Sequence, residues 1–352
     1  MATLNEREKE RIIELLEKGE DLPLDYKYIL FPPEKKEYEL VYAGKEREED
    51  ILADTMAVPL QPIRTFGTNG NGWTNKLIFG DNLQVMKSLL DDPEVKGQVK
   101  LIYIDPPFAT KQEFKGSQDQ KAYQDKIAGA KFVEFLRKRL IFLRELLADD
   151  GSIYVHLDWK KSHYIKTIMD EIFFENNFLN EVIWYYRRWN IKTNLFARNH
   201  DCLLFYAKKA GKHIFNNLYI PKSSKSSGEG KAWQSVIGED GIRRSVLLDV
   251  ESKGVPMPDI WEISVINPVG LERKEVGYPT QKPEALLERI IKASSNKGDI
   301  VLDAFAGSGT TLAVAEKLDR RWISIDCGKL AIYTMQKRLL NLKSEIGNKG
   351  KK

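Results

Sequence analysis

Two apolar runs, each followed at once by a short motif of small and polar residues, constrain the fold of this chain most. The first run, 99–104, leads into Asp105-Pro106-Pro107-Phe108. The second, 300–303, leads into Ala304-Phe305-Ala306-Gly307-Ser308-Gly309-Thr310. A buried strand that ends in a turn before a helix is the repeating unit of doubly wound α/β folds. The chain follows this alternation from residue 76 onward, so we expect a mostly parallel sheet covered by helices.

The motif from Asp105 to Phe108 combines groups that suit an exocyclic amino group. Asp105 offers a carboxylate oxygen, and Pro106 offers a carbonyl with no N–H to compete. The prolines at 106 and 107 restrict φ, so both acceptors are held in place before a substrate arrives. Phe108 offers a ring that can stack on a base swung out of a helix. For the tetrapeptide alone, an ordinary Pro-Pro turn remains the alternative.

The glycine-rich motif favours a nucleoside-bearing cofactor. Gly307 and Gly309 allow a ligand to approach the backbone where a helix over 311–318 begins. The dinucleotide fingerprint needs Gly or Ala three residues after its second glycine, and Leu312 in that place disfavours a nicotinamide cofactor. Asp326 ends the next apolar strand, 17 residues after Gly309, where such folds place an acid on the ribose hydroxyls. A purely structural turn is the alternative.

Five further motifs join these two, and together they resemble the β-group of DNA amino-methyltransferases. The resemblance is strongest to modification subunits of type III restriction systems and related site-specific DNA methyltransferases. The motifs follow the family's order over about residues 76–207 and 276–335; the five are Gly80-Asp81-Asn82-Leu83, Ala122-Tyr123-Gln124-Asp125-Lys126, 151–158, Asn180-Glu181-Val182-Ile183-Trp184 and Tyr278-Pro279-Thr280-Gln281-Lys282-Pro283.

The resemblance implies a fold, a reaction and a cofactor. The fold is a Rossmann-like, doubly wound, mostly parallel sheet of seven strands. The reaction transfers a methyl group from S-adenosyl-L-methionine directly and in line to the N6 amino group of a flipped adenine in double-stranded DNA. In this family, a first motif that begins with Asp favours N6-adenine over N4-cytosine as the target. Phe108 occupies a position where Tyr is commoner in the family.

The resemblance also assigns site residues. The catalytic set is Asp105, Pro106, Pro107 and Phe108. The cofactor set is Asp81, Asp105, Thr280, Lys282, Asp303, Phe305, Ala306, Gly307, Ser308, Gly309, Thr310 and Asp326. Three of these assignments have plain structural alternatives: Asp81 as a helix N-cap, Thr280 as a turn cap and Lys282 as a solvated side chain.

The chain divides into four predicted segments. Residues 1–75 form a helical and irregular extension, with a helix over 4–19. Residues 76–207 form the catalytic half of the methyltransferase domain, in which 109–130 is a loop over the site and 132–147 a helix. Residues 208–275 are an inserted target-recognition segment, and 276–352 form the cofactor-binding half. This insertion is short and type III subunits are usually much longer, so a solitary enzyme or a partner-dependent one is expected.

Charge is distributed unevenly along the chain and indicates a nucleic-acid surface in its middle. Residues 1–75 carry 10 Lys/Arg against 16 Asp/Glu, whereas 185–275 carry 15 against 10. Basic residues interleaved with aromatic ones suit phosphate contact and base stacking. A solvated loop is the alternative for any one of them. The predicted DNA-binding residues are Tyr123, Arg187, Arg188, Arg198, Lys222, Lys225, Arg243 and Arg244.

Other sequence features indicate the cellular compartment, the metal content and the partners of the protein. Only Cys202 and Cys327 are present, which indicates a reducing compartment and no zinc site. No apolar run reaches 18 residues, so we expect no membrane span and a cytoplasmic, nucleoid-associated protein. His156 and Asp158 share a strand face, but without a third ligand nearby we expect no metal site. A homodimer and a restriction subunit are the partners that relatives suggest.

Two rival functions remain open at this point. One is methylation of a different amine, such as cytosine N4, an RNA adenine or a protein amide. The Asp start argues against the amide enzymes, which have an Asn-Pro-Pro-Tyr motif. The other rival is a non-catalytic DNA-recognition subunit, which intact Asp105 and Gly307-Ser308-Gly309 disfavour.

Overall fold

The protein was analysed as a computed structural model, and its chain separates into two units, Met1–Leu40 and Val41–Lys352. In the first unit, α1 (Glu6–Glu17) forms the amphipathic helix expected near the start of the chain. The second unit holds the sheet. The structure describes residues 6–20, 39–65, 72–107, 121–187, 194, 196–220, 231–237, 242–251, 253–266, 276–278, 280–342 and 346.

An eight-stranded, mostly parallel sheet forms the centre of the second unit, in the order β1-β12-β11-β2-β3-β5-β4-β10. The bounds of these strands are Lys76–Phe79, Arg321–Asp326, Ile300–Asp303, Val99–Ile104, Leu147–Leu157, His200–Ala207, Phe178–Tyr185 and Ile260–Glu262, in the same order. β5 is antiparallel to both of its neighbours, β3 and β4.

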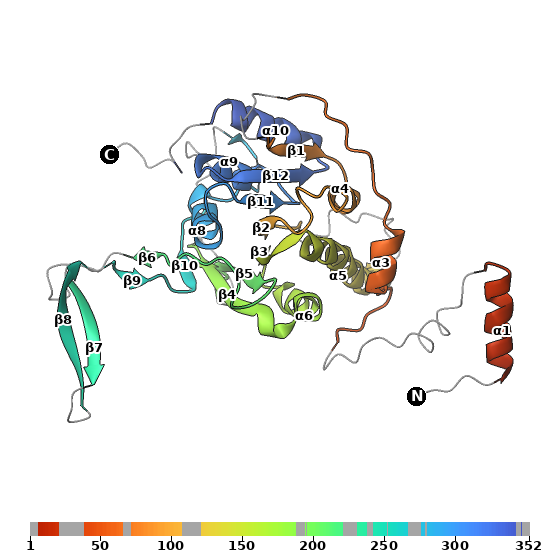
Figure 1. Cartoon of the computed structure of the whole chain (residues 1–352), viewed down its shortest axis with the longest axis horizontal. Helices are drawn as coiled ribbons and strands as arrows, with labels where there is room; N and C mark the ends of the chain where they lie inside the picture. Colours follow the sequence, from red (N-terminus) through yellow and green to blue (C-terminus); the bar gives the residue numbers. More distant parts are fainter. Residues whose placement is uncertain are drawn as a thin grey trace. The chain divides into compact units, whose positions relative to one another are not determined.

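Helices cover both faces of this sheet, which is the doubly wound arrangement. Figure 1 shows α8 and α9 on one side of the sheet and α4, α5 and α6 on the other. Their bounds are Glu284–Ser294, Thr310–Lys317, Asn82–Leu89, Lys121–Leu146 and Ser162–Phe173, and the turn η2 (Glu175–Asn177) follows α6. The chain also forms α3 (Glu48–Asp54) and α10 (Lys329–Leu340), neither of which we had predicted.

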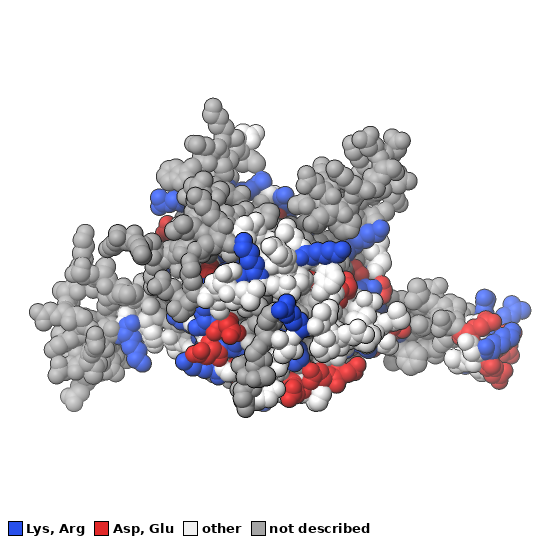
Figure 2. Space-filling view, turned by 90° about the horizontal axis from the view of Figure 1, so that it is seen from above, with Lys and Arg blue, Asp and Glu red and all other residues white. Residues whose placement is uncertain are grey.

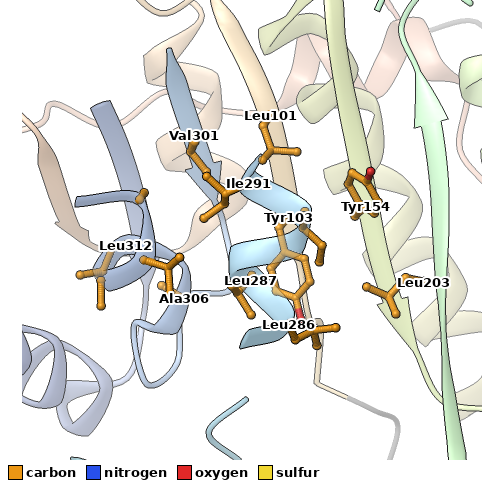
Figure 3. Packing of buried hydrophobic residues seen from close by; sticks show 14 of the residues in the cluster. Leu101, Tyr103, Tyr154, Leu203, Leu286, Leu287, Ile291, Val301, Ala306 and Leu312 are labelled. Carbon is orange, nitrogen blue, oxygen red and sulfur yellow. The ribbon is translucent and has the colours of Figure 1, made fainter. Parts of the chain in front are cut away.

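The core on the α8 side joins the two halves of the domain. Leu286, Leu287 and Ile291 of α8 are buried together with Leu101 of β2 and Val301 of β11 (Figure 3). Apolar residues spaced along one face of α8 fit the groove over these strands, and burial of each contributes roughly 2 kcal/mol. The two strands that carry the sequence motifs therefore share one packed layer.

Two predictions about this unit were wrong. The sheet has eight strands where we expected seven, because β10 from the predicted insertion pairs in parallel with β4. The predicted loop over 109–130 does not extend that far, because α5 begins at Lys121. Its first ten residues contain Gly129 and only one aliphatic residue larger than Ala, Ile127, so no apolar stripe indicated the helix. Residues 109–120 of that prediction lie outside the described residues.

The predicted insertion contains short antiparallel pairs in addition to β10. β6 (Tyr219–Ile220) pairs with β9 (Val255–Pro256), and β7 (Lys231–Ile237) pairs with β8 (Arg243–Glu251). Among the described helices, none is both long enough and apolar enough to span a membrane.

We expect Gly309→Ala to destabilise the protein by about 1–3 kcal/mol. Gly309 has φ +71°, and a Cβ there would lie 2.5 Å from Cγ of Met335 in α10. The control is Gly211→Ala, since Gly211 has φ +80° with nothing within 4 Å of its Cβ position. Thermal unfolding should show the larger loss for Gly309→Ala, and equal losses would contradict the packing argument.

Candidate functional site

The carboxyl ends of four parallel strands bring the predicted site residues to one edge of the sheet. β1, β12, β11 and β2 are successive neighbours, and they end beside Asp81, Asp326, Asp303 and Asp105 respectively. The cofactor-motif strand β11 pairs directly with the catalytic-motif strand β2, although about 200 residues separate them in sequence. In open α/β sheets this edge is where ligands bind.

Asp105 lies at this edge with one carboxylate oxygen occupied and the other unpaired. Lys282 Nζ lies 2.7 Å from Asp105 Oδ2, and the two side chains are 15% and 20% exposed. Asp105 Oδ1 is buried and has no hydrogen-bond partner within the described part of the chain. Pro106 is buried, Pro107 is exposed, and Phe108 lies outside the described residues. An unpaired buried acceptor is costly unless a ligand satisfies it.

Gln281, next to Lys282 in sequence, is a second buried group of this kind. Its side chain is only 6% exposed, and neither its amide nitrogen nor its amide oxygen has a partner in the described residues. Thr280 is exposed. We had not predicted a role for Gln281. The only sequence signal for such a role was its position between Thr280 and Lys282, two predicted cofactor contacts.

Asp326 accepts backbone hydrogen bonds from the glycine-rich loop and from the turn after β12. The Gly307 N–H donates to Asp326 Oδ2 at 2.8 Å, and the Gly328 N–H donates to Oδ1 at 2.7 Å. Gly307 has φ +49°, and Tyr278 Cε1 would be the nearest atom to a Cβ there, at 3.7 Å. Each carboxylate oxygen of Asp326 can accept a further hydrogen bond. Its binding to ribose hydroxyls stays a prediction.

Asp303 is buried at the start of the same loop. Its Oδ1 accepts the Phe305 N–H at 2.9 Å, and its Oδ2 accepts the Thr311 hydroxyl at 2.5 Å. Burial raises the pKa of Asp303 to about 7, against the lowering effect of these two hydrogen bonds. The loop therefore contains a carboxyl group that ionises near neutral pH and would be stabilised as an anion by a bound cation.

Asp81 has the capping geometry that was its structural alternative. Its Oδ1 accepts the N–H groups of Leu83 and Gln84, at 3.0 and 3.4 Å. Its Oδ2 lies 3.1 Å from Arg139 of α5. Capping occupies one oxygen only, and the side chain is half exposed, so the predicted cofactor contact stays a prediction.

Arg139 and Asn82 connect this cap to the cofactor strand, and neither was assigned a role from the sequence. Arg139 Nε donates to Asn82 Oδ1 at 2.5 Å, and Asn82 Nδ2 donates to the Ala304 carbonyl at 2.7 Å. The guanidinium lies 3.5 Å over the Phe135 ring. Burial lowers the pKa of Arg139 to about 10, so it remains charged at neutral pH.

A buried charge cluster fixes the loop against α8 and α10. Glu284 accepts from Lys317 at 2.7 and 2.9 Å and from Arg338 at 2.8 Å. Arg338 also donates to the Ser308 carbonyl and the Thr310 hydroxyl, both at 3.2 Å. The Thr310 hydroxyl in turn donates to the Lys282 carbonyl. This cluster links the loop to the segment that carries Lys282, and its charged members Glu284, Lys317 and Arg338 belong to no sequence motif.

The predicted DNA-binding residues are only partly described. Arg187 and Arg198 are exposed; Arg198 lies 3.7 Å over the Trp159 ring, and Arg187 lies 3.9 Å from Glu262. Arg243 and Arg244 are exposed on β8. Arg188, Lys222, Lys225 and the side chain of Tyr123 lie outside the described part. On the face in Figure 2, the described Lys and Arg side chains stand in separate groups, some beside acidic ones, and form no single basic patch.

Comparison of the whole sequence with known proteins identifies a family for this chain. Residues 99–337 match a family described as DNA methylase. The chain is 31% identical to type II methyltransferase M.EcaI of Enterobacter cloacae, over 90% of this chain and 81% of that protein. It is 28% identical to DNA adenine methyltransferase YhdJ of Escherichia coli (strain K12), over 75% of this chain and 82% of the relative.

The chain is also similar to a type III protein. It is 28% identical to the type III restriction-modification enzyme StyLTI Mod subunit of Salmonella typhimurium, over 77% of this chain and 53% of that subunit. The chain therefore spans about half the length of this relative, which agrees with the expectation that type III subunits are longer.

We expect Asp303→Asn to stabilise the cofactor-free protein, and more so at pH 8 than at pH 5. In the unfolded chain the carboxyl ionises near pH 4, whereas in the folded protein it keeps its proton up to a pKa of about 7. Wild-type stability is therefore lost as pH rises through this window, on the order of a few kcal/mol. Asn can still accept from Phe305 and donate to Thr311.

Thermal unfolding at both pH values tests this. Asp299→Asn is the matched control, because Asp299 immediately precedes the same strand, β11, at its other end. A gain in melting temperature that does not grow with pH, or that also occurs with Asp299→Asn, would refute the cost assigned to Asp303.

Proposed function

Because the chain belongs to the DNA methylase family, and is thus a DNA methyltransferase that uses S-adenosylmethionine, we propose that it methylates the N6 amino group of adenine. The Asp start of its catalytic motif and the adenine specificity named for the Escherichia coli relative support this target. Its similarity to a type II methyltransferase and to a Mod subunit supports a place in restriction-modification.

The unpaired Asp105 Oδ1 is the observation that carries the proposal. The lone pair of an exocyclic amine is delocalised into its ring, and an acceptor on its N–H favours the more tetrahedral, nucleophilic form. Since Lys282 occupies Oδ2, Oδ1 is the oxygen left to accept that N–H. The Pro106 carbonyl is the second proposed acceptor, and Phe108 is the proposed stacking ring. Prior orientation of these groups removes much of the entropic barrier.

The residues around the glycine-rich loop fit S-adenosylmethionine. This cofactor, when bound, supplies a methyl group activated by a sulfonium charge. Asp303 and Asp326 present carboxylate oxygens at the ends of β11 and β12, and both Gly307 and Gly309 have positive φ. We assign these four residues, with Thr280, Lys282 and the backbone of residues 305–310, to the cofactor. Asp81 and Asp105 complete the proposed set beside them.

We also propose base flipping, which the burial of Asp105 supports. Its side chain is only 20% exposed at the sheet edge, where an amino group paired inside a duplex would not reach it. The proposed phosphate contacts are Arg187 and Arg198, on the segment between β4 and β5, together with Arg243 and Arg244. A homodimer and a restriction subunit are proposed partners.

Asp105→Ala should reduce methylation by about 100- to 1,000-fold, because a preorganised hydrogen-bonding group is lost. S-adenosylmethionine binding, measured by calorimetry, should persist, because the other proposed cofactor contacts remain. Asp149→Ala, at the opposite end of β3 from the site, is the matched control and should methylate like wild type. Near-wild-type activity of Asp105→Ala would remove the assigned role.

Nucleoside mass spectrometry of DNA from cells that express the chain identifies the target. N6-methyladenine supports the proposal. N4-methylcytosine would overturn the adenine assignment and leave the methyltransferase assignment intact. Parallel assays on matched RNA test the RNA alternative, and absent cofactor binding would favour a non-catalytic recognition subunit.

A further inference from the structure

Four polar side chains form a connected row behind Asp105, on the face of the sheet that α8 covers. The Tyr103 hydroxyl lies 2.8 Å from His156 Nδ1, and His156 Nε2 lies 3.2 Å from Asp201 Oδ2. The Tyr186 hydroxyl donates to Asp201 Oδ1 at 3.0 Å. Tyr103, His156 and Asp201 lie in β2, β3 and β5, and Tyr186 directly follows β4, so the row crosses four neighbouring strands.

The protonation states of the row define every hydrogen-bond direction in it. Burial would raise the pKa of Asp201, but hydrogen bonding to His156 holds it below its usual value, so Asp201 is an anion that only accepts. His156 Nε2 must therefore carry a proton. Burial, with the Lys282 charge, lowers the pKa of His156, so the ring is neutral and Nδ1 accepts. Tyr103 must then donate.

Tyr103 can only be a donor in this arrangement, because burial and the Asp105 charge raise its pKa well above its usual value. The tautomer of His156 thus follows from its two partners. The ring is fully buried and packs edge-on against Trp184, with centroids 5.5 Å apart. Both of its nitrogens are occupied, so the row explains the His156 that the sequence left without a role.

The ends of the row lie at two functional regions. Tyr103 lies in β2 and Asp105 directly follows its last residue, Ile104, so the two-residue alternation of a strand places both side chains on the same face. At the other end, Tyr186 N–H donates to the Asn199 carbonyl at 2.8 Å, which closes the base of the segment that carries Arg187 and Arg198. Lys282 and Asp105 are the charged groups that act on His156 from beyond the row.

We propose that Tyr103, His156, Asp201 and Tyr186 are positioning residues that hold the end of β2, and thereby Asp105, in register with the segment between β4 and β5. The inference rests on the proposed function, since it names residues that support the same site. None of the four is assigned a contact with substrate. The row aligns Asp105 with the region proposed to contact DNA phosphates.

Tyr103→Phe and Tyr154→Phe form a matched pair that tests the proposal. Each removes one buried tyrosine hydroxyl from a neighbouring strand of the same face, but Tyr154 bonds to Ser294 and lies outside the row. We expect Tyr103→Phe to lower kcat about tenfold or more with the Kd for S-adenosylmethionine unchanged, because a small misplacement of a reacting group is costly. Tyr154→Phe should leave kcat within about twofold.

A second pair separates positioning from mere structure. His156→Gln keeps a donor for Asp201 and an acceptor for Tyr103 but cannot titrate, whereas His156→Leu keeps neither group. Gln should restore most of kcat relative to Leu. It should also remove any fall in kcat caused by protonation of His156 at low pH. Equal kcat values for the two variants would overturn the proposal.

Hydrogen exchange gives a readout that does not depend on the target base. The amides of Ile104 and Asp105 should exchange faster in Tyr103→Phe than in Tyr154→Phe. If Tyr103→Phe and Tyr154→Phe have the same exchange rates and the same kcat, the row does not position β2. If wild type instead methylates cytosine, the proposed target fails, but the same kcat ratio and exchange rates still decide the role of the row.

Discussion

The direct pairing of β11 with β2 is the constraint on which the rest of this structure depends. It places two motifs about 200 residues apart on adjacent parallel strands, with both carboxyl ends at one edge. Pairing two such distant segments carries a large loop-closure entropy cost, which burial of apolar surface must offset. α8 supplies much of that burial, because Leu286, Leu287 and Ile291 pack across both strands. Asp105 and the glycine-rich loop are neighbours because this layer is continuous.

The polar groups at this edge oppose folding and support function. Asp303 is nearly fully buried and holds its proton to a pKa of about 7, and Asp105 Oδ1 lacks a partner among the described residues. Such groups persist where the surroundings over-determine their positions. Here the surroundings include Glu284 with its two cationic partners and Arg139 with Asn82. The stable part of the fold thus holds an unfavourable arrangement that a cofactor and a base would relieve.

Much of the site could be predicted from sequence because its signals are local. A strand that ends in Asp105-Pro106-Pro107, or one that ends in Asp303 before two glycines, carries its chemistry within a few residues. The residues that sequence missed act through distant partners. Glu284 meets Arg338 of α10, and Arg139 reaches Asn82 from α5. His156 drew notice only as a doubtful metal ligand, because its partners Tyr103 and Asp201 lie 53 and 45 residues away.

The sequence by itself determined the doubly wound class, the order of the motifs and the chemical groups offered by Asp105, Asp303 and Asp326, since period, turn residues and side-chain type are local properties. Tertiary structure decided the eighth strand, the early start of α5 and the partners of each charge. These features depend on which surfaces meet once the chain has folded. Short segments such as 121–130 and 260–262 do not encode those contacts by themselves. Asp105 illustrates both contributions. The sequence specifies its carboxylate, whereas the folded position of Lys282 determines which carboxylate oxygen stays unpaired.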